Sequence, residues 1–163
     1  MAGGGCGWRN PKSEKTVSLF GCMKVVIDSS VFVAAFREKE PYSREAFSIV
    51  ERLQEGSLSA YLPVSVVIEV VAAIRRRSGS VELAEQVGQA ILTLPDISLI
   101  DLTTFRMARY LELAQEIGLA GMDVIVVGTA QEFDVPLLTL DKEIIERVKK
   151  SVHILNMDDF KER

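Results

Sequence analysis

The sequence predicts an α/β domain of three layers, α/β/α, in which helices cover both faces of a mainly parallel central sheet. Short β-branched runs alternate along the chain with stretches of helical periodicity, and this alternation is typical of parallel strands joined by crossover helices. The chain has 163 residues, of which 48% are hydrophobic. That is enough for one domain with a substantial core and too little for two domains of ordinary size.

The first 22 residues differ in composition from the rest of the chain. They contain five glycines and Pro11, and they carry three basic residues and one acid. Such a segment has little preference for helix or strand. We therefore expect residues 1–22 to be a flexible extension or a misassigned start, with a basic arm for RNA as the alternative. Residues 23–163 are expected to form the domain, which should fold without the extension.

Five strands are predicted from apolar and β-branched runs bounded by turn residues. The first is buried, since it consists of Lys24 followed by Val25, Val26 and Ile27, and it ends at an aspartate. The five strands are expected near residues 24–28, 58–62, 97–100, 136–139 and 152–156. Boundaries predicted in this way hold only to about three residues.

Seven helices are predicted between these strands. In the second helix, Ala46, Phe47, Val50 and Leu53 are spaced to form one buried face. Serine and threonine are natural helix caps, and several of the helices begin just after one. The helical stretches follow Ser30, Ser43, Ser65, Ser80, Thr103, Met122 and Lys142.

Four acids lie where an α/β fold brings them to one rim of the sheet. Asp28 ends the first strand and Asp141 stands just past the fourth, while Glu69 and Asp123 enter predicted helices within about the first turn. These positions face the carboxyl edge of the sheet, where open α/β folds bind ligands. Converging carboxylates repel one another unless a divalent cation joins them. The pattern predicts a site for a hard, oxygen-preferring cation.

Each acid alone also has an ordinary explanation, because acids cap helices and favour their positive ends. A capping box at Ser65 would need Glu or Gln at position 68, where the chain has Ile68. Glu69 is thus not used by the cap, and in so apolar a segment it needs a partner or a metal. Asp28 would also suit a haloacid-dehalogenase-like phosphatase. That class has a second acid two residues later, however, and this chain has Ser30 at that position.

The cysteine, histidine and charge content excludes several classes. Cys6 and Cys22 both lie in the extension, and His153 is the only histidine, so histidine-rich zinc sites and Ser or Cys triads are disfavoured. No stretch approaches the ~20 apolar residues of a membrane span, and no secretory signal is evident. We expect a cytoplasmic location. The net charge of −4 argues against a nucleic-acid coat but not against a metal-dependent nuclease.

Together these motifs resemble the PIN-domain ribonuclease family, most closely its VapC-like toxin branch. The resemblance runs from Met23 to about Met157 and rests on Asp-Ser-Ser after the first strand, Ser-x-x-x-Glu, Met-Asp before Ala130, and Leu-Leu-Thr-x-Asp. It implies binding of Mg²⁺ or Mn²⁺ and cleavage of single-stranded or looped RNA. The metal-site residues that it implies are Asp28, Glu69, Asp123 and Asp141, supported by Ser30 and Thr139.

The resemblance also implies partners. VapC-like proteins typically form homodimers and are neutralised by a small antitoxin protein whose C-terminal segment occupies the site. The alternatives are a PIN-domain nuclease of RNA processing, or a PIN scaffold that acts mainly through protein binding. With no histidine near the acids, cleavage through the 2′-hydroxyl has no general base, so products with a 5′-phosphate and a 3′-hydroxyl are expected.

Three arginines, Arg75, Arg76 and Arg77, end the helix that carries Glu69. Arg76 lies seven residues after Glu69, which is about two turns along the same face. It is therefore the candidate for holding an RNA phosphate. The alternative is that the arginines complement the helix C-terminus and stay solvated.

Overall fold

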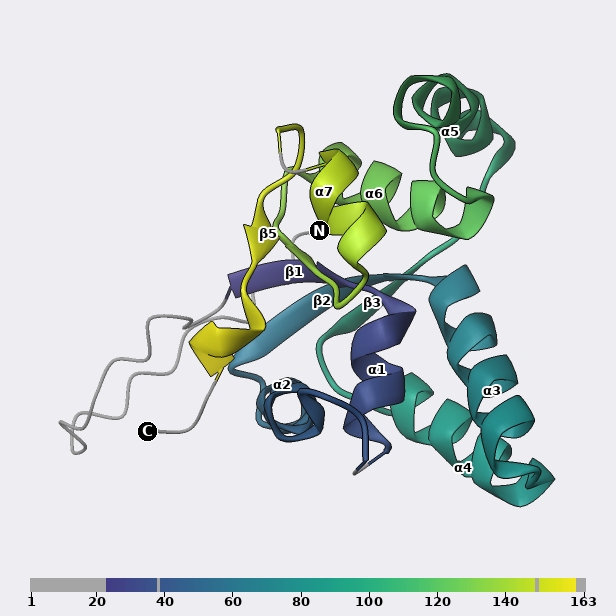
Figure 1. The fold of residues 1–163 in the computed structure, drawn as a ribbon, viewed down its shortest axis with the longest axis vertical. Helices are drawn as coiled ribbons and strands as arrows, with labels where there is room; N and C mark the ends of the chain where they lie inside the picture. Colours follow the sequence, from purple (N-terminus) through teal and green to yellow (C-terminus); the bar gives the residue numbers. More distant parts are fainter. Residues whose placement is uncertain (1–22, 38, 149, 161–163) are drawn as a thin grey trace, which may run out of the picture.

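Helices cover both faces of a central sheet in the computed structural model (Figure 1), which describes residues 23–37, 39–148 and 150–160. Within these residues the sheet has five strands in the order β3-β2-β1-β4-β5, and every neighbouring pair is parallel. The predicted α/β/α architecture is confirmed, and the sheet is parallel throughout. The predicted extension, residues 1–22, lies outside the described residues.

The central strand is built from the first apolar run of the sequence. Val25, Val26 and Ile27 have no exposed surface, as expected for a parallel strand covered on both faces. The fourth and fifth strands lie where the sequence predicts them but are only two residues long. The strands are β1 (Met23–Ile27), β2 (Leu58–Pro63), β3 (Ile97–Ile100), β4 (Leu137–Leu138) and β5 (Ile154–Leu155).

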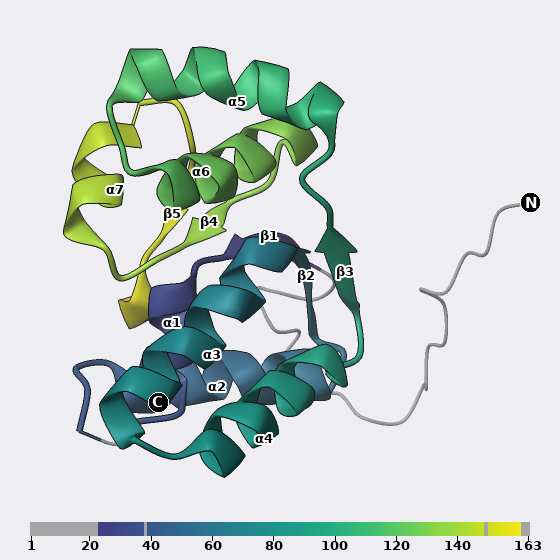
Figure 2. The same ribbon diagram turned by 90° about the vertical axis from the view of Figure 1, so that its right-hand side faces the viewer.

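All seven predicted helices are present, four on one side of the sheet and three on the other (Figures 1 and 2). The first side has α1 (Ser29–Ala35), α2 (Ser43–Gln54), α3 (Val64–Ser78) and α4 (Val81–Leu92). The other side has α5 (Thr104–Ile117), α6 (Gly121–Phe133) and α7 (Lys142–Val148). In the described part of the chain no single helix is long and apolar enough to cross a membrane, whereas α5 and α6 taken together, bent by 110°, meet that criterion by length and composition only.

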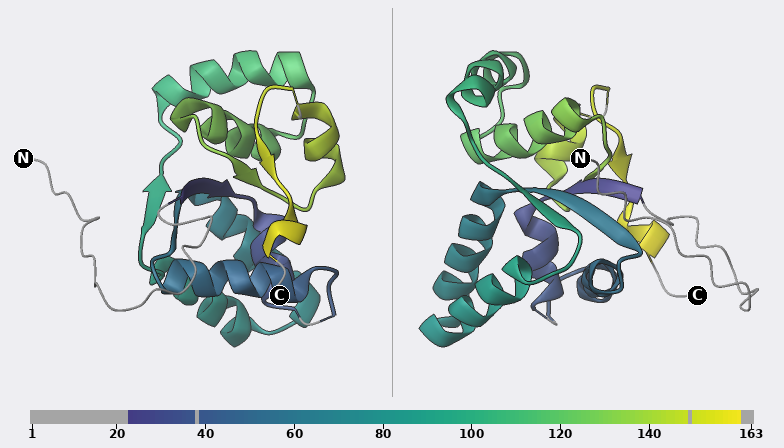
Figure 3. Two further views of the ribbon diagram at one scale, coloured as in Figure 1. Left: turned by 90° about the vertical axis from the view of Figure 1, so that its left-hand side faces the viewer. Right: turned by 180° about the vertical axis from the view of Figure 1, so that it is seen from behind.

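The last described residues of the chain lie beside α2. A short 3₁₀ helix, η1 (Met157–Phe160), packs beside α2 (Figure 3). The Ser48 hydroxyl on α2 donates to the Phe160 carbonyl at 3.1 Å, and the Phe160 side chain is buried. This contact attaches the last described segment of the chain to α2.

The start of α3 differs from the prediction. The helix begins at Val64 after Pro63, which makes no side-chain cap hydrogen bond. Ser65, the predicted cap, instead lies in the first turn, where its buried hydroxyl has no hydrogen-bond partner within the described structure. Val66 and Val70, in the first two turns of this helix, are buried in the hydrophobic core. The N-cap is Pro63, whose φ of −54° is already close to the helical value, so the chain enters α3 without a serine cap.

We expect Ser65→Ala to leave the free energy of unfolding unchanged or to raise it by about 1 kcal/mol, because it removes an unsatisfied buried hydroxyl. The matched control is Ser80→Ala, since the Ser80 hydroxyl accepts a hydrogen bond from the Leu83 N–H at 3.1 Å and caps α4. That substitution should lower stability by about 1 kcal/mol. Urea unfolding of both variants measures the difference. Equal losses at the two serines would contradict the structure.

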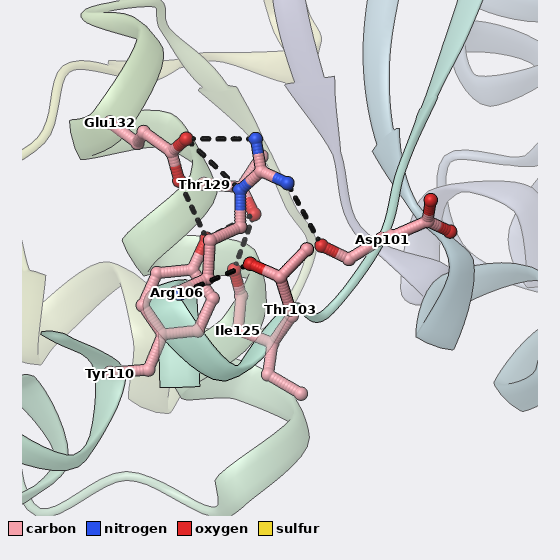
Figure 4. Close-up of polar contacts among 7 residues, drawn as sticks. All are labelled: Asp101, Thr103, Arg106, Tyr110, Ile125, Thr129 and Glu132. Carbon is pink, nitrogen blue, oxygen red and sulfur yellow. Dashed lines mark hydrogen bonds and ion pairs between the residues drawn. The ribbon is translucent and has the colours of Figure 1, made fainter. Parts of the chain in front are cut away.

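A polar network joins α5 to α6 (Figure 4). The Arg106 guanidinium donates to both oxygens of Glu132 at 3.0 Å and to the Asp101 carbonyl at 3.0 Å. The Tyr110 hydroxyl donates to Glu132 and contacts the Thr129 hydroxyl, both at 3.2 Å. The hydrogen bond from Arg106 lowers the pKa of Glu132, so the pair stays ionised near neutral pH. The network holds α5 on the helix that carries Asp123.

Candidate active site

The sheet brings the segments that carry the predicted acids to one edge of the molecule, which Figure 2 views face on. Ile27 pairs with Leu138, so Asp28 and the residues after β4 leave the sheet side by side. Helix α3 begins directly after β2, the neighbour of β1 on its other side. Helix α6 contacts α3, β1 and β2. Four elements from distant parts of the sequence therefore converge at the carboxyl edge.

Asp28 is the most buried of the four acids, with 4% of its surface exposed. Its Oδ2 atom accepts hydrogen bonds from the backbone N–H of Ser30 at 3.3 Å, from the Ser30 hydroxyl, and from the Thr139 hydroxyl at 2.9 Å. Asp28 is thus the N-cap of α1, which is the ordinary role that the sequence analysis allowed for it. Its other oxygen receives no hydrogen bond from the described residues and stays available to a ligand.

Ser30 and Thr139 also tie two loops together. The Ser30 hydroxyl accepts from the Leu140 N–H at 3.0 Å, and the Thr139 hydroxyl accepts from the Asp141 N–H at 3.1 Å. The turn after β1 is therefore bonded to the segment between β4 and α7. This network sets the position of Asp28 relative to Asp141.

Asp141 also divides its oxygens between a helix cap and the site. Its Oδ1 atom accepts from the backbone N–H of Glu143 at 2.7 Å and of Ile144 at 3.2 Å, which caps α7. Glu69 is the sixth residue of α3, in its second turn, close to the predicted place within about the first turn. Asp123 is the third residue of α6, and both of these acids are half-buried.

The pKa of Asp123 shows that the other predicted acids lie close enough for their charges to act on it. Its pKa is raised to about 6, first by burial and then by the negative charges of Asp28, Asp141, Glu69 and Glu143. Glu143 is an acid that the sequence interpretation missed. Its place two residues after Asp141, in the first turn of α7, was the available indication that it faces the same edge. Its side chain forms an ion pair with Arg147 at 3.0 Å.

The acids do not yet form a closed metal site. In the described residues, no group of three His, Cys, Asp or Glu side chains is close enough to hold a metal ion. Repulsion keeps like charges apart, and one oxygen each of Asp28 and Asp141 is occupied by hydrogen bonds. The donor set nevertheless fits Mg²⁺ or Mn²⁺, because carboxylate oxygens are the ligands that these ions prefer.

The raised pKa of Asp123 predicts a pH dependence. A carboxyl whose pKa is about 6 in the folded protein and near 3.9 in the unfolded chain binds protons preferentially when folded. Without metal, its contribution to stability is therefore full below about pH 4 and lost as the pH rises through 6. Asp123→Asn should remove this loss and stabilise the metal-free protein at pH 7 by about 1–2 kcal/mol, after allowance for solvent screening.

Urea unfolding in EDTA from pH 4 to pH 8 measures this effect. The control is Glu116→Gln, which removes an exposed acid from α5. If Asp123→Asn and the control have the same pH profile as the wild type, the shared field of the acids is refuted.

Arg76 lies apart from the acids. It is exposed in the last turn of α3, about two turns from Glu69 along the helix. The structure thus does not bring it to the carboxylates, and any contact with RNA would fall outside the acid cluster.

Comparison with known proteins agrees with this architecture. The PIN domain family model matches residues 25–151, a range that includes all four acids. No curated protein matches the chain.

Similar solved structures come from toxin–antitoxin systems. VapBC2 from Rickettsia felis, bound to a promoter DNA fragment, has a TM-score of 0.63 and 15% identity over 82% of this chain and 98% of that one. VapC20 from Mycobacterium tuberculosis, a sarcin-ricin loop cleaving toxin, has a TM-score of 0.62 and 12% identity over 75% and 93%. A toxin–antitoxin complex from Klebsiella pneumoniae has a TM-score of 0.57 and 16% identity over 82% and 97%. At such identities the likeness shows the fold alone.

Proposed function

The chain belongs to the PIN-domain family, and from this premise we propose that it is a metal-dependent endoribonuclease and the toxin of a toxin–antitoxin pair. The observation that carries the proposal is the acid cluster at the carboxyl edge of the sheet. Burial in the first place, and then the negative charges of the other members, raise the pKa of Asp123 to about 6. Structural acids that only cap helices have no reason to share a field in this way.

The residues that would hold Mg²⁺ or Mn²⁺ are Asp28, Glu69, Asp123 and Asp141. When bound, such an ion supplies positive charge at the scissile phosphate and makes water a better nucleophile. Ser30 and Thr139 hold the Asp28 carboxylate by donating to one of its oxygens, so that the other oxygen would be the one to bind the ion.

The protein itself offers no imidazole for general-base catalysis. The only histidine of the sequence, His153, precedes β5 at the amino edge of the sheet, whereas the acids lie at the carboxyl edge. Cleavage through the 2′-hydroxyl therefore lacks its usual base. We expect products with a 5′-phosphate and a 3′-hydroxyl.

The experiment that tests the proposal is incubation of the purified protein with total RNA in Mg²⁺, in Mn²⁺ and in EDTA, followed by mapping of the cleaved ends. Cleavage should require the ion and leave 5′-phosphates. Cleavage that persists in EDTA, or ends that carry a 2′,3′-cyclic phosphate, would contradict the mechanism.

A small antitoxin is the partner that this function requires. The similar Klebsiella pneumoniae structure is a toxin–antitoxin complex, which supports the proposal. A short neighbouring reading frame with a DNA-binding N-terminus would favour the toxin over the RNA-processing nuclease or the protein-binding scaffold. The cytoplasmic location stays a prediction.

We also propose a homodimer, because large apolar side chains are exposed along the connection from β3 into α5. Phe105 is 87% exposed, and Leu99, Leu102 and Leu111 are each about half exposed. An apolar surface of this kind is typical of an interface between proteins. Two copies related by a twofold axis would cover it.

Light scattering at micromolar concentration should give twice the chain mass of 18.0 kDa. We expect Phe105→Glu to give the 18.0 kDa species, since a charge in the interface must be desolvated. Leu83→Glu, on α4, replaces another exposed apolar residue and should leave the mass unchanged. A wild-type protein that is monomeric under these conditions ends this proposal.

A further inference from the structure

Cations gather at one end of the molecule, away from the acid cluster. Arg75, Arg76 and Arg77 form the last turn of α3, and Arg37 and Lys39 follow α1. We propose that this basic end binds RNA phosphates a few nucleotides from the scissile bond and so anchors the substrate. The inference rests on the proposed function in taking RNA as the ligand.

A shared acid holds the two basic segments together. Glu40 accepts a hydrogen bond from Arg77 at 3.1 Å and is also bonded by Arg37. Figure 2 shows the end of α3 beside the loop between α1 and α2. With Glu40 occupied by two arginines, Arg75 and Arg76 remain exposed and have no ion-pair partner in the part of the chain that the structure describes. They are free to bind an anion.

The outer face of α3 connects this end to the acids. Glu69 and Arg76 are seven residues apart, so they lie on nearly the same face about 10 Å apart along the axis. Ala72 lies one turn from each and is exposed, so no large side chain separates them. An RNA strand with one phosphate at the acid cluster can therefore continue along α3 and bring a later phosphate to Arg76.

Charge favours a polyanion as the ligand. The chain has a net charge of −4, yet the described residues 37, 39, 40 and 75–77 at this end comprise five cations and one acid, Glu40. The helix dipole explains a cation at the end of each helix. It does not explain why Arg37, from the segment after α1, meets Arg77 at the end of α3 around one acid. Guanidinium groups bind phosphate in a bidentate manner, which an RNA backbone satisfies at successive positions.

The test uses the double variant Arg75→Gln/Arg76→Gln. The matched control is Arg109→Gln/Lys150→Gln, which removes two exposed cations elsewhere. Binding to a long single-stranded RNA is measured by fluorescence anisotropy in EDTA, so that no strand is cleaved, over a series of salt concentrations. The RNA Kd of the double variant should rise roughly tenfold at low salt, and the slope of log K against log salt should fall by about 1.4, since each contact contributes about 0.7.

Cleavage kinetics give a second readout. In Mg²⁺ the double variant should raise KM for the long RNA and leave kcat unchanged, because the anchor does not touch the reacting phosphate. A very short RNA that cannot reach α3's end should be cleaved equally by the double variant and the wild type. Arg75→Lys/Arg76→Lys, which retains the charge, should recover part of the affinity.

The outcomes separate this inference from the proposed function. If the wild type binds and cleaves RNA but the arginine variant matches the control in Kd, salt slope and KM, only the anchor is overturned. If the wild type neither binds nor cleaves RNA, the proposed function falls and the anchor falls with it. If the arginine variant instead turns a dimer into a monomer with RNA binding intact, the basic end serves a second copy and the inference is overturned.

Discussion

Asp28→Asn should abolish metal-dependent RNA cleavage while the protein stays folded and, in EDTA, is at least as stable as the wild type. The asparagine amide oxygen can accept the hydrogen bonds that Ser30 and Thr139 now donate to Oδ2, and Asn caps helices about as well as Asp. What is lost is one negative charge at the acid cluster. In the metal-free protein this relieves repulsion toward Asp123, whose pKa the Asp28 charge helps to raise.

The wild type and Asp28→Asn should also differ in how much a metal ion raises their melting temperatures. An ion that binds only the folded state stabilises it by about 2.7 kcal/mol at a hundred times its dissociation constant, so Mg²⁺ or Mn²⁺ should raise the melting temperature of the wild type. Asp28→Asn should gain much less. The control is Asp134→Asn, which removes an exposed charge at the end of α6 in a left-handed conformation that Asn tolerates. It should keep both the metal response and the activity.

Melting curves with and without the ion, together with RNA cleavage assays, decide this prediction. If Asp28 were only a helix cap, the substitution would preserve cleavage and the metal response alike. Full activity in Asp28→Asn would therefore refute the role of the four carboxylates.

Gly128→Ala should lower the free energy of unfolding by about 1–3 kcal/mol, the usual effect of overpacking a core. An added Cβ would lie 2.5 Å from Cε1 of Tyr110 and 2.6 Å from its Cδ1, far inside van der Waals contact. The ring has little freedom to move, since it is 4% exposed and its hydroxyl is bonded to Glu132 and Thr129. The higher helix propensity of alanine, about 1 kcal/mol, offsets only part of the loss.

Gly121→Ala is the matched control, because it adds the same methyl group to the same helix where no atom lies within 4 Å. It should be neutral or stabilising. In a double-mutant cycle, Tyr110→Leu should make Gly128→Ala less harmful, since the two changes act on one contact. Urea unfolding measures the four proteins of the cycle and the Gly121→Ala control. Equal stability of Gly128→Ala and Gly121→Ala would show that α5 does not pack on α6 as the structure has it.

The prediction at α3 shows why sequence patterns locate helices better than their first residues. The apolar spacing of the segment predicts a helix, and the helix is present over Val64–Ser78. The cap at Ser65 was wrong, because the helix begins two residues earlier than predicted, at Val64 after Pro63, and Ser65 is buried in the first turn. Propensity is a weak preference that tertiary packing overrides.

At the candidate site, too, the sequence predicted part of the arrangement and tertiary packing decided the rest. The sequence predicted which four acids would face the carboxyl edge, since strand ends and helix starts follow from local periodicity and the parallel topology. It could not predict how each carboxylate divides its oxygens. Asp141 both caps α7 and faces the edge, so the capping and metal-site interpretations of that acid are compatible. Glu143 was missed because its place two residues after Asp141 was the one local indication, and a solvated glutamate is equally common in the first turn of a helix.

By itself, then, the sequence determined the order of strands and helices and the parallel three-layer architecture, and it predicted four of the five acids that the structure groups electrostatically, without Glu143. These depend on hydrophobic periods of two and 3.6 residues, which are properties of short segments. Only the tertiary structure decided that Thr139 donates to Asp28 across 111 positions of sequence, that Glu40 joins the ends of two helices, and that Tyr110 packs on Gly128. Such contacts join side chains that only the complete packing of the chain brings together, and no local pattern encodes their distance.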